Sequence, residues 1–69
     1  MKFKHVLINK ELDSKVVFET FINQYTQVPY ILRYDYTLDN GFISKETLPN
    51  VHHLMSHYNQ LDETGYVSI

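Results

Sequence analysis

Two histidines, His53 and His57, have the spacing that most resembles a metal site in this chain. They stand four positions apart, so on a helix both imidazoles lie on one stripe, within reach of a single ion. A functional zinc site needs three or four ligands, and the metalloprotease motif needs Glu directly after the first His, where this chain has Leu54. The apolar positions of the same helix also place both histidines on its outward side. We therefore expect no metal and no cofactor, with His53 and His57 as weak candidates for metal or ligand sensing.

Other catalytic patterns are missing as well. The chain has no Cys, and none of its serines stands in a nucleophile-elbow context. Two glycines, Gly41 and Gly65, are too few for a glycine-rich phosphate loop. The sequence predicts a protein that is not an enzyme.

A stripe of tyrosines is the next chemical feature. Tyr30, Tyr34 and Tyr36 alternate with Ile31, Arg33 and Asp35, as side chains on the two faces of a strand do. On an outward face they would form a stacking platform for bases. Leu32 shares the stripe, which favours the core face instead, and the net charge of −2 argues against nucleic-acid binding. A nucleic-acid-associated regulator that uses a Tyr-rich sheet face is thus the alternative function.

The elements that must position these residues follow from hydrophobic periodicity. We predict a strand at 3–8, a helix at about 15–26, a strand at 30–37 and a hairpin at Asn40-Gly41. A second helix over 51–61, with Thr47 as its cap and Pro49 in its first turn, and a short strand at 66–69 complete the chain.

This order predicts one α+β domain over residues 1–69. Its small antiparallel sheet carries two helices on one face, in the β-α-β-β-α-β order of the ferredoxin-like split βαβ arrangement. The rival for 16–22 is a strand, because Val16, Val17, Phe18 and Thr20 are strand-favouring types. That alternative is a β-hairpin meander with a single C-terminal helix.

The predicted topology brings three turns to one end of the sheet. Five of the eight carboxylates then gather there, namely Glu11, Asp13, Asp39, Asp62 and Glu63. We interpret this acidic end as a docking surface for a basic patch on another protein.

Together these features predict a small protein-binding module that acts as a regulator, inhibitor or adaptor, with another protein as partner or as a homodimer. An excess of Lys over Arg, with many Asn, Ile and Tyr residues, is typical of AT-rich genomes. Compact chains of this kind are common among phage and mobile-element products that block host proteins. No apolar stretch approaches the ~20 residues of a membrane span, and residues 1–4 lack a signal-peptide core, so we expect a cytoplasmic location without membrane contact.

Overall fold

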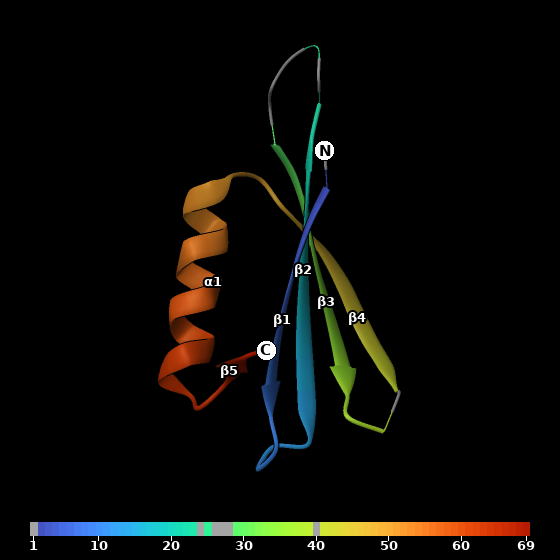
Figure 1. The fold of residues 1–69 in the computed structure, drawn as a ribbon, viewed down its shortest axis with the longest axis vertical. Coiled ribbons are helices and arrows are strands. Elements are labelled where there is room, and N and C mark those ends of the chain that lie inside the picture. Colours follow the sequence, from blue (N-terminus) through green and yellow to red (C-terminus); the bar gives the residue numbers. More distant parts are fainter. Residues whose placement is uncertain (1, 24, 26–28, 40) are drawn as a thin grey trace.

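The computed structural model describes residues 2–23, 25, 29–39 and 41–69, which form a twisted sheet flanked by one helix (Figure 1). All strand pairs are antiparallel, and the strand order is β4-β3-β2-β1-β5. The elements are β1 (Lys2–Asn9), β2 (Ser14–Ile22), β3 (Pro29–Thr37), β4 (Phe42–Leu48), α1 (Val51–Glu63) and β5 (Val67–Ser68). The fold is therefore a meander sheet with a single helix, as in the alternative architecture above.

The predicted first helix is wrong. Ser14–Ile22 forms β2, which pairs with β1 on one side and with β3 on the other. The helical arc in the sequence arose because β2 carries apolar residues on both of its faces, Val16 and Phe18 on one and Val17 and Phe21 on the other. β-branched and aromatic side chains fit a pleated surface, and this preference decided the structure. The ferredoxin-like order with two helices is overturned with it.

The predicted second helix is confirmed as α1, but its cap is different. The side chain of Asn50 accepts a hydrogen bond from the backbone N–H of His53 at 3.1 Å, while Thr47 belongs to β4 and Pro49 precedes the helix. Beyond the other end of α1, Gly65 takes φ of +101°, a left-handed conformation that glycine adopts without steric cost. The chain can therefore turn back toward β1 and form β5.

The hairpin between β3 and β4 is also confirmed, since the backbone N–H of Thr37 donates to the carbonyl of Gly41 at 2.8 Å. The exact turn expected at Asn40-Gly41 includes Asn40, which lies outside the described residues.

The core lies between α1 and one face of the sheet, which we call the helix face. Its buried members are Leu7, Val16, Phe18, Ile31, Leu48 and Leu61, with Leu54, Tyr58 and Tyr66 packed around them. Along β3, Ile31 points to the helix face, so Tyr30, Tyr34 and Tyr36 point to the opposite side, which we call the open face. The interpretation of the tyrosine stripe as the core face is therefore wrong.

The buried position of Ile31 yields a stability prediction with an internal control. Ile31→Val removes one methylene from a fully buried site and should lower the free energy of unfolding by about 1 kcal/mol. Ile43→Val makes the same chemical change on β4, where the side chain is 60% exposed, and should have little effect. Urea denaturation followed by circular dichroism measures both. Equal losses in the two variants would contradict this assignment of the core.

Candidate functional site

The open face consists of four rows of side chains that run across the strands. Residues opposite each other in the strand register share a face, so the pairing defines these rows directly. From one end of the sheet to the other they are Lys2-Phe21-Tyr30, Lys4-Glu19-Leu32-Thr47, Val6-Val17-Tyr34-Lys45 and Ile8-Lys15-Tyr36-Phe42. No helix formed by the described residues covers this face (Figure 1).

Aromatic rings dominate this surface. Tyr34 and Tyr36 lie nearly parallel with ring centroids 6.3 Å apart, and the rings of Tyr36 and Phe42 form a T-shaped contact with centroids 5.8 Å apart. Tyr30 contacts Phe21 at 6.2 Å. Tyr30 is 52% exposed and Phe42 60% exposed, so aromatic surface remains open to solvent at both ends of the rows.

Lysine side chains lie over these rings. The Lys15 ammonium lies 4.9 Å from the ring centre of Tyr36, and that of Lys45 lies 5.8 Å from the ring centre of Tyr34. Lys2 makes the same contact with Phe21 at 5.6 Å. Such cation–π contacts hold the lysine stems along apolar surface and keep their charges at the face.

The charges of the molecule are segregated. Four lysines and a single carboxylate, Glu19, give the open face a formal charge of +3. The remaining two basic and seven acidic residues give the rest of the molecule −5, in agreement with the net charge of −2. The net charge of −2 is therefore the sum of a basic open face and a more strongly acidic remainder of the molecule.

Glu19 and Tyr34 line a shallow hollow in this face. It has a volume of about 320 Å³, and its other lining residues are Lys4, Lys15, Val17 and Tyr36. The hydrogen-bonded ammonium of Lys2, 2.9 Å from the carboxylate, lowers the pKa of Glu19 below its usual 4.5. Loss of solvation, followed by hydrogen bonding to Glu19, raises the pKa of Tyr34 above 10.0. At neutral pH the hollow thus holds a carboxylate and a neutral phenol beside two lysines.

The five predicted acidic residues do lie toward one end of the molecule. In Figure 1 the β1–β2 turn, the β3–β4 turn and the C-terminal end of α1 all lie at the bottom of the view. The backbone N–H of Leu38 donates to the carbonyl of Asp13 at 3.1 Å and links the first two of these turns. Exposed carboxylates at this end are Glu11, Asp13, Asp39, Asp62 and Glu63.

The two candidate metal-binding histidines do not converge. His53 is exposed and its ring Nδ1 lies 3.0 Å from the side-chain oxygen of Asn50. His57 is half-buried and turned toward the sheet, so its expected outward position is wrong. Among the described residues no group of three or more His, Cys, Asp or Glu side chains is placed to hold a metal ion.

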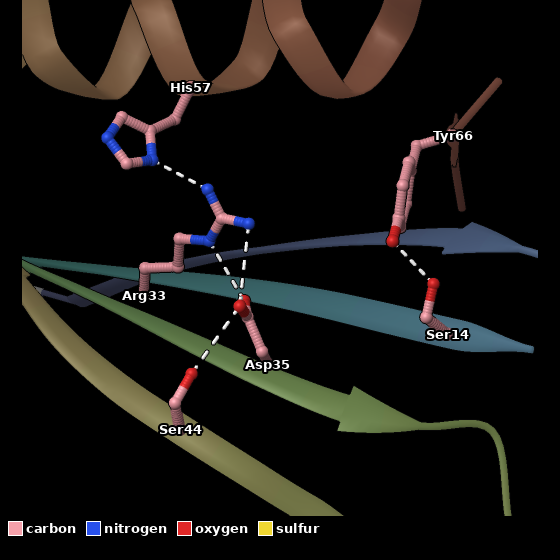
Figure 2. A network of polar contacts seen from close by, with 6 residues as sticks. All are labelled: Ser14, Arg33, Asp35, Ser44, His57 and Tyr66. Atoms are coloured by element: carbon pink, nitrogen blue, oxygen red, sulfur yellow. Dashed lines mark hydrogen bonds and ion pairs between the residues drawn. The ribbon is translucent and has the colours of Figure 1, made fainter. Parts of the chain in front are cut away.

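His57 instead belongs to a polar network on the helix face that sequence reasoning missed (Figure 2). Its Nδ1 lies 2.6 Å from a guanidinium nitrogen of Arg33, and because arginine only donates, this nitrogen must accept. Arg33 also bonds to Asp35 at 2.9 Å and lies 5.9 Å from the ring centre of Phe18. The network joins α1 to β3 next to the core. The alternation of Arg33 with the tyrosines was its only signal in the sequence.

A second polar link ties the turn after α1 to the sheet. The hydroxyls of Tyr66 and Ser14 are hydrogen-bonded (Figure 2), and the buried side chain of Asn9 donates to the Thr64 carbonyl at 3.0 Å. These contacts hold the end of α1 against β1 and β2.

Comparison with protein-family models, curated proteins and solved structures finds no significant match to this chain. In the described part of the chain, α1 is too short and too polar to span a membrane.

The Lys2–Glu19 ion pair gives a titration prediction. Because the folded pKa of Glu19 is lowered, its contribution to stability is present above about pH 4.5 and is lost as pH falls through the folded pKa. Lys2→Met should move the pKa of Glu19 back toward 4.5, since it removes the largest cause of the shift. NMR titration of the Glu19 carboxyl carbon measures this. Lys45→Met removes a lysine from the other side of the same face and should leave the Glu19 titration where it is.

Proposed function

We propose that this protein binds single-stranded nucleic acid through the open face of its sheet. The observation that carries the proposal is the combination on one uncovered face of four lysines, five aromatic rings and one carboxylate. Proteins that bind single strands pair a cationic surface with aromatic rings on which bases stack.

The open face presents side chains of four strands rather than a helix, which favours single strands over duplexes. Reading a duplex requires an element that enters a groove, typically a helix or a two-stranded ribbon. Unstacked bases, in contrast, lie flat on exposed rings, and a four-stranded RNA-recognition sheet stacks two or three of them. The exposed Tyr30 and Phe42 and the half-buried Tyr34 and Tyr36 offer a similar number of positions.

The placement of the lysines supports the same function. Lys4 and Lys15 border the hollow beside Tyr34 and Tyr36, and Lys45 lies on the neighbouring strand. A strand whose bases stack on the tyrosines would have its phosphates within reach of these ammonium groups. The low net charge of the chain does not oppose this, because its carboxylates lie mostly on other surfaces.

Reversal of two charges tests the proposal. Lys15→Glu/Lys45→Glu should weaken binding to a fluorescein-labelled oligo(dT) or oligo(U) at least tenfold in fluorescence anisotropy. The slope of log affinity against log salt should fall by roughly 1.4 in magnitude, since each phosphate contact to a single strand contributes about 0.7. Lys10→Glu reverses one charge in the β1–β2 turn, away from the rings, and is the control for charge reversal outside the open face.

Removal of an exposed ring extends this experiment to stacking. Tyr30→Ala should cost about 1–3 kcal/mol of binding free energy, whereas Tyr25→Ala, at a 95% exposed position between β2 and β3, should cost little. If wild-type protein shows no salt-dependent binding to either oligonucleotide, the proposal is wrong.

Protein binding at the acidic end is a second candidate, favoured by a hollow of about 480 Å³ that adjoins it. Ile8, Val67 and Ile69 give this hollow an apolar lining, and Lys10 and Glu11 stand at its side. An apolar anchor next to carboxylates suits a basic partner segment, because a buried anchor supplies most binding energy and the charges select the partner.

Charge reversal tests this second candidate. Glu11→Lys/Asp62→Lys should abolish specific retention of a basic protein from cell lysate on the immobilised chain, since the two introduced lysines repel a basic partner. Lys15→Glu/Lys45→Glu should retain the same protein at the wild-type level. Unchanged retention by the acidic-end variant, measured by quantitative mass spectrometry, would rule out this docking surface.

A further inference from the structure

Among the described residues, the outer edge of β1 is paired along only part of its length. β5 pairs with Leu7 and Ile8, and the backbone N–H of Ile69 donates to the carbonyl of Val6 at 3.1 Å. In an antiparallel strand the N–H and C=O groups of one residue point to the same neighbouring strand, and those of every second residue point to the same side. The N–H and C=O groups of Lys2 and Lys4 therefore point to the same edge as those of Val6, beyond the part of β1 that β5 covers.

A groove runs beside this unpaired part of β1. His5 and Phe18 of the sheet and Leu54, Met55 and Tyr58 of α1 enclose a hollow of about 230 Å³. In Figure 1 β5 lies at the lower part of β1, near the C-terminal end of α1. The hollow is smaller than the 300–1,000 Å³ typical of small-molecule pockets, so it suits a single large side chain.

Exposed apolar side chains occur on the same two elements as the hollow. On β1 Phe3, which shares a face with His5, is 45% exposed, and on α1 Val51 is 49% and Met55 is 51% exposed. A strand added to β1 would direct every second side chain to the helix face, next to Phe3 and His5. Those side chains would therefore need to be apolar.

The charges at this edge determine which side chains are favoured at the other positions of an added strand. The alternate positions of an added strand would lie on the open face, beside Lys2 and Lys4. Antiparallel pairing of β1 with a second copy of β1, centred on Phe3, would oppose Lys2 to Lys4 and is disfavoured by like-charge repulsion. Acidic side chains at these positions are attracted instead.

We infer that the unpaired edge of β1 and the groove under α1 bind an extended peptide in which acidic and apolar residues alternate. The peptide adds as a strand to β1, and its backbone forms hydrogen bonds with the backbone N–H and C=O groups of Lys2 and Lys4. One apolar side chain of the peptide enters the hollow lined by Leu54, Met55 and Tyr58. This mode combines backbone hydrogen bonds for affinity with a side-chain pocket for specificity. The site shares Lys2 and Lys4 with the open face, but its backbone edge and the hollow under α1 are separate from the aromatic rings of that face, so it does not depend on the proposed nucleic-acid binding.

A synthetic peptide, acetyl-Glu-Ile-Glu-Phe-Glu-Ile-amide, is the probe, titrated into the full chain. On binding, NMR should show slower hydrogen exchange at the outward-pointing amide of Lys4, with no change at His5, whose amide faces β2. The same peptide with Lys in place of Glu should bind at least tenfold more weakly. A peptide in which the backbone nitrogens that face β1 are methylated should also lose binding, because it cannot donate hydrogen bonds to the carbonyl groups of β1.

Two substitutions at one position separate the backbone from the charge. Lys4→Pro removes the outward N–H without disturbing the pairing of β1 with β2, as proline is tolerated where its nitrogen faces away from the ladder. It should weaken peptide binding about tenfold relative to Lys4→Ala, which keeps the N–H; tenfold corresponds to about 1.4 kcal/mol, on the order of a hydrogen bond. Circular dichroism shows whether each variant is folded.

Met55→Ala tests the groove without altering the edge, and it should weaken binding of the Phe-containing peptide more than that of a version with Ala in place of Phe. Three results would overturn the inference. The first is equal peptide binding by Lys4→Pro and Lys4→Ala. The second is loss of peptide binding in Lys15→Glu/Lys45→Glu, which would place the peptide on the open face. The third is formation of concentration-dependent dimers that Lys4→Pro blocks, which would show that a second copy of the chain pairs with this edge.

Discussion

The packing of one helix against one face of the sheet is the constraint on which the rest of this structure depends. Phe18, Leu7, Ile31 and Val16 are almost completely shielded from solvent, and α1 supplies Leu61, Leu54 and Tyr58 to cover them. In the described part of the chain no other helix covers the sheet, so its second face is exposed to water. A domain of this size buries only about 60% of the surface of its unfolded chain, and most of that burial must occur on the helix face.

The open face is stable in water because its side chains shield each other. Val17 and Leu32 are buried although α1 lies on the other side, since the tyrosines and the aliphatic parts of the lysines surround them. Lys15 and Lys45 lie over tyrosine rings, so the contacts that shield the apolar residues also concentrate positive charge. A surface arranged in this way to satisfy packing is at the same time suited to an anionic, aromatic ligand.

Sequence patterns predicted the elements with a single period and failed where two periods overlapped. The segment 30–37 alternates cleanly and 51–61 has one apolar helical stripe, and both form the predicted elements as β3 and α1. In 16–22 the apolar residues serve the core on one side and the open face on the other, which a helical wheel reads as a single arc. The tyrosines were assigned to the core for another reason, because Leu32 shares their stripe, and Leu32 is indeed buried but on the open face.

The acidic end shows that a wrong topology can still place residues correctly. In the predicted fold a strand–helix turn, a hairpin and a helix end shared one edge of the sheet. In the meander the β1–β2 and β3–β4 turns share an end because successive hairpins alternate, and α1 starts at the far end and returns (Figure 1). Chain reversals at the same sequence positions therefore brought the carboxylates together in both folds.

Charge segregation then follows from the same geometry. Side chains on β1 to β4 alternate between the helix face and the open face, and the lysines of these strands occupy the open-face positions while most carboxylates of the chain lie in turns or on α1. A basic face and an acidic end are consequently built on one core. Because substitutions in these surface groups leave Phe18 and Ile31 in place, each surface can be altered without removing the packing that supports the other.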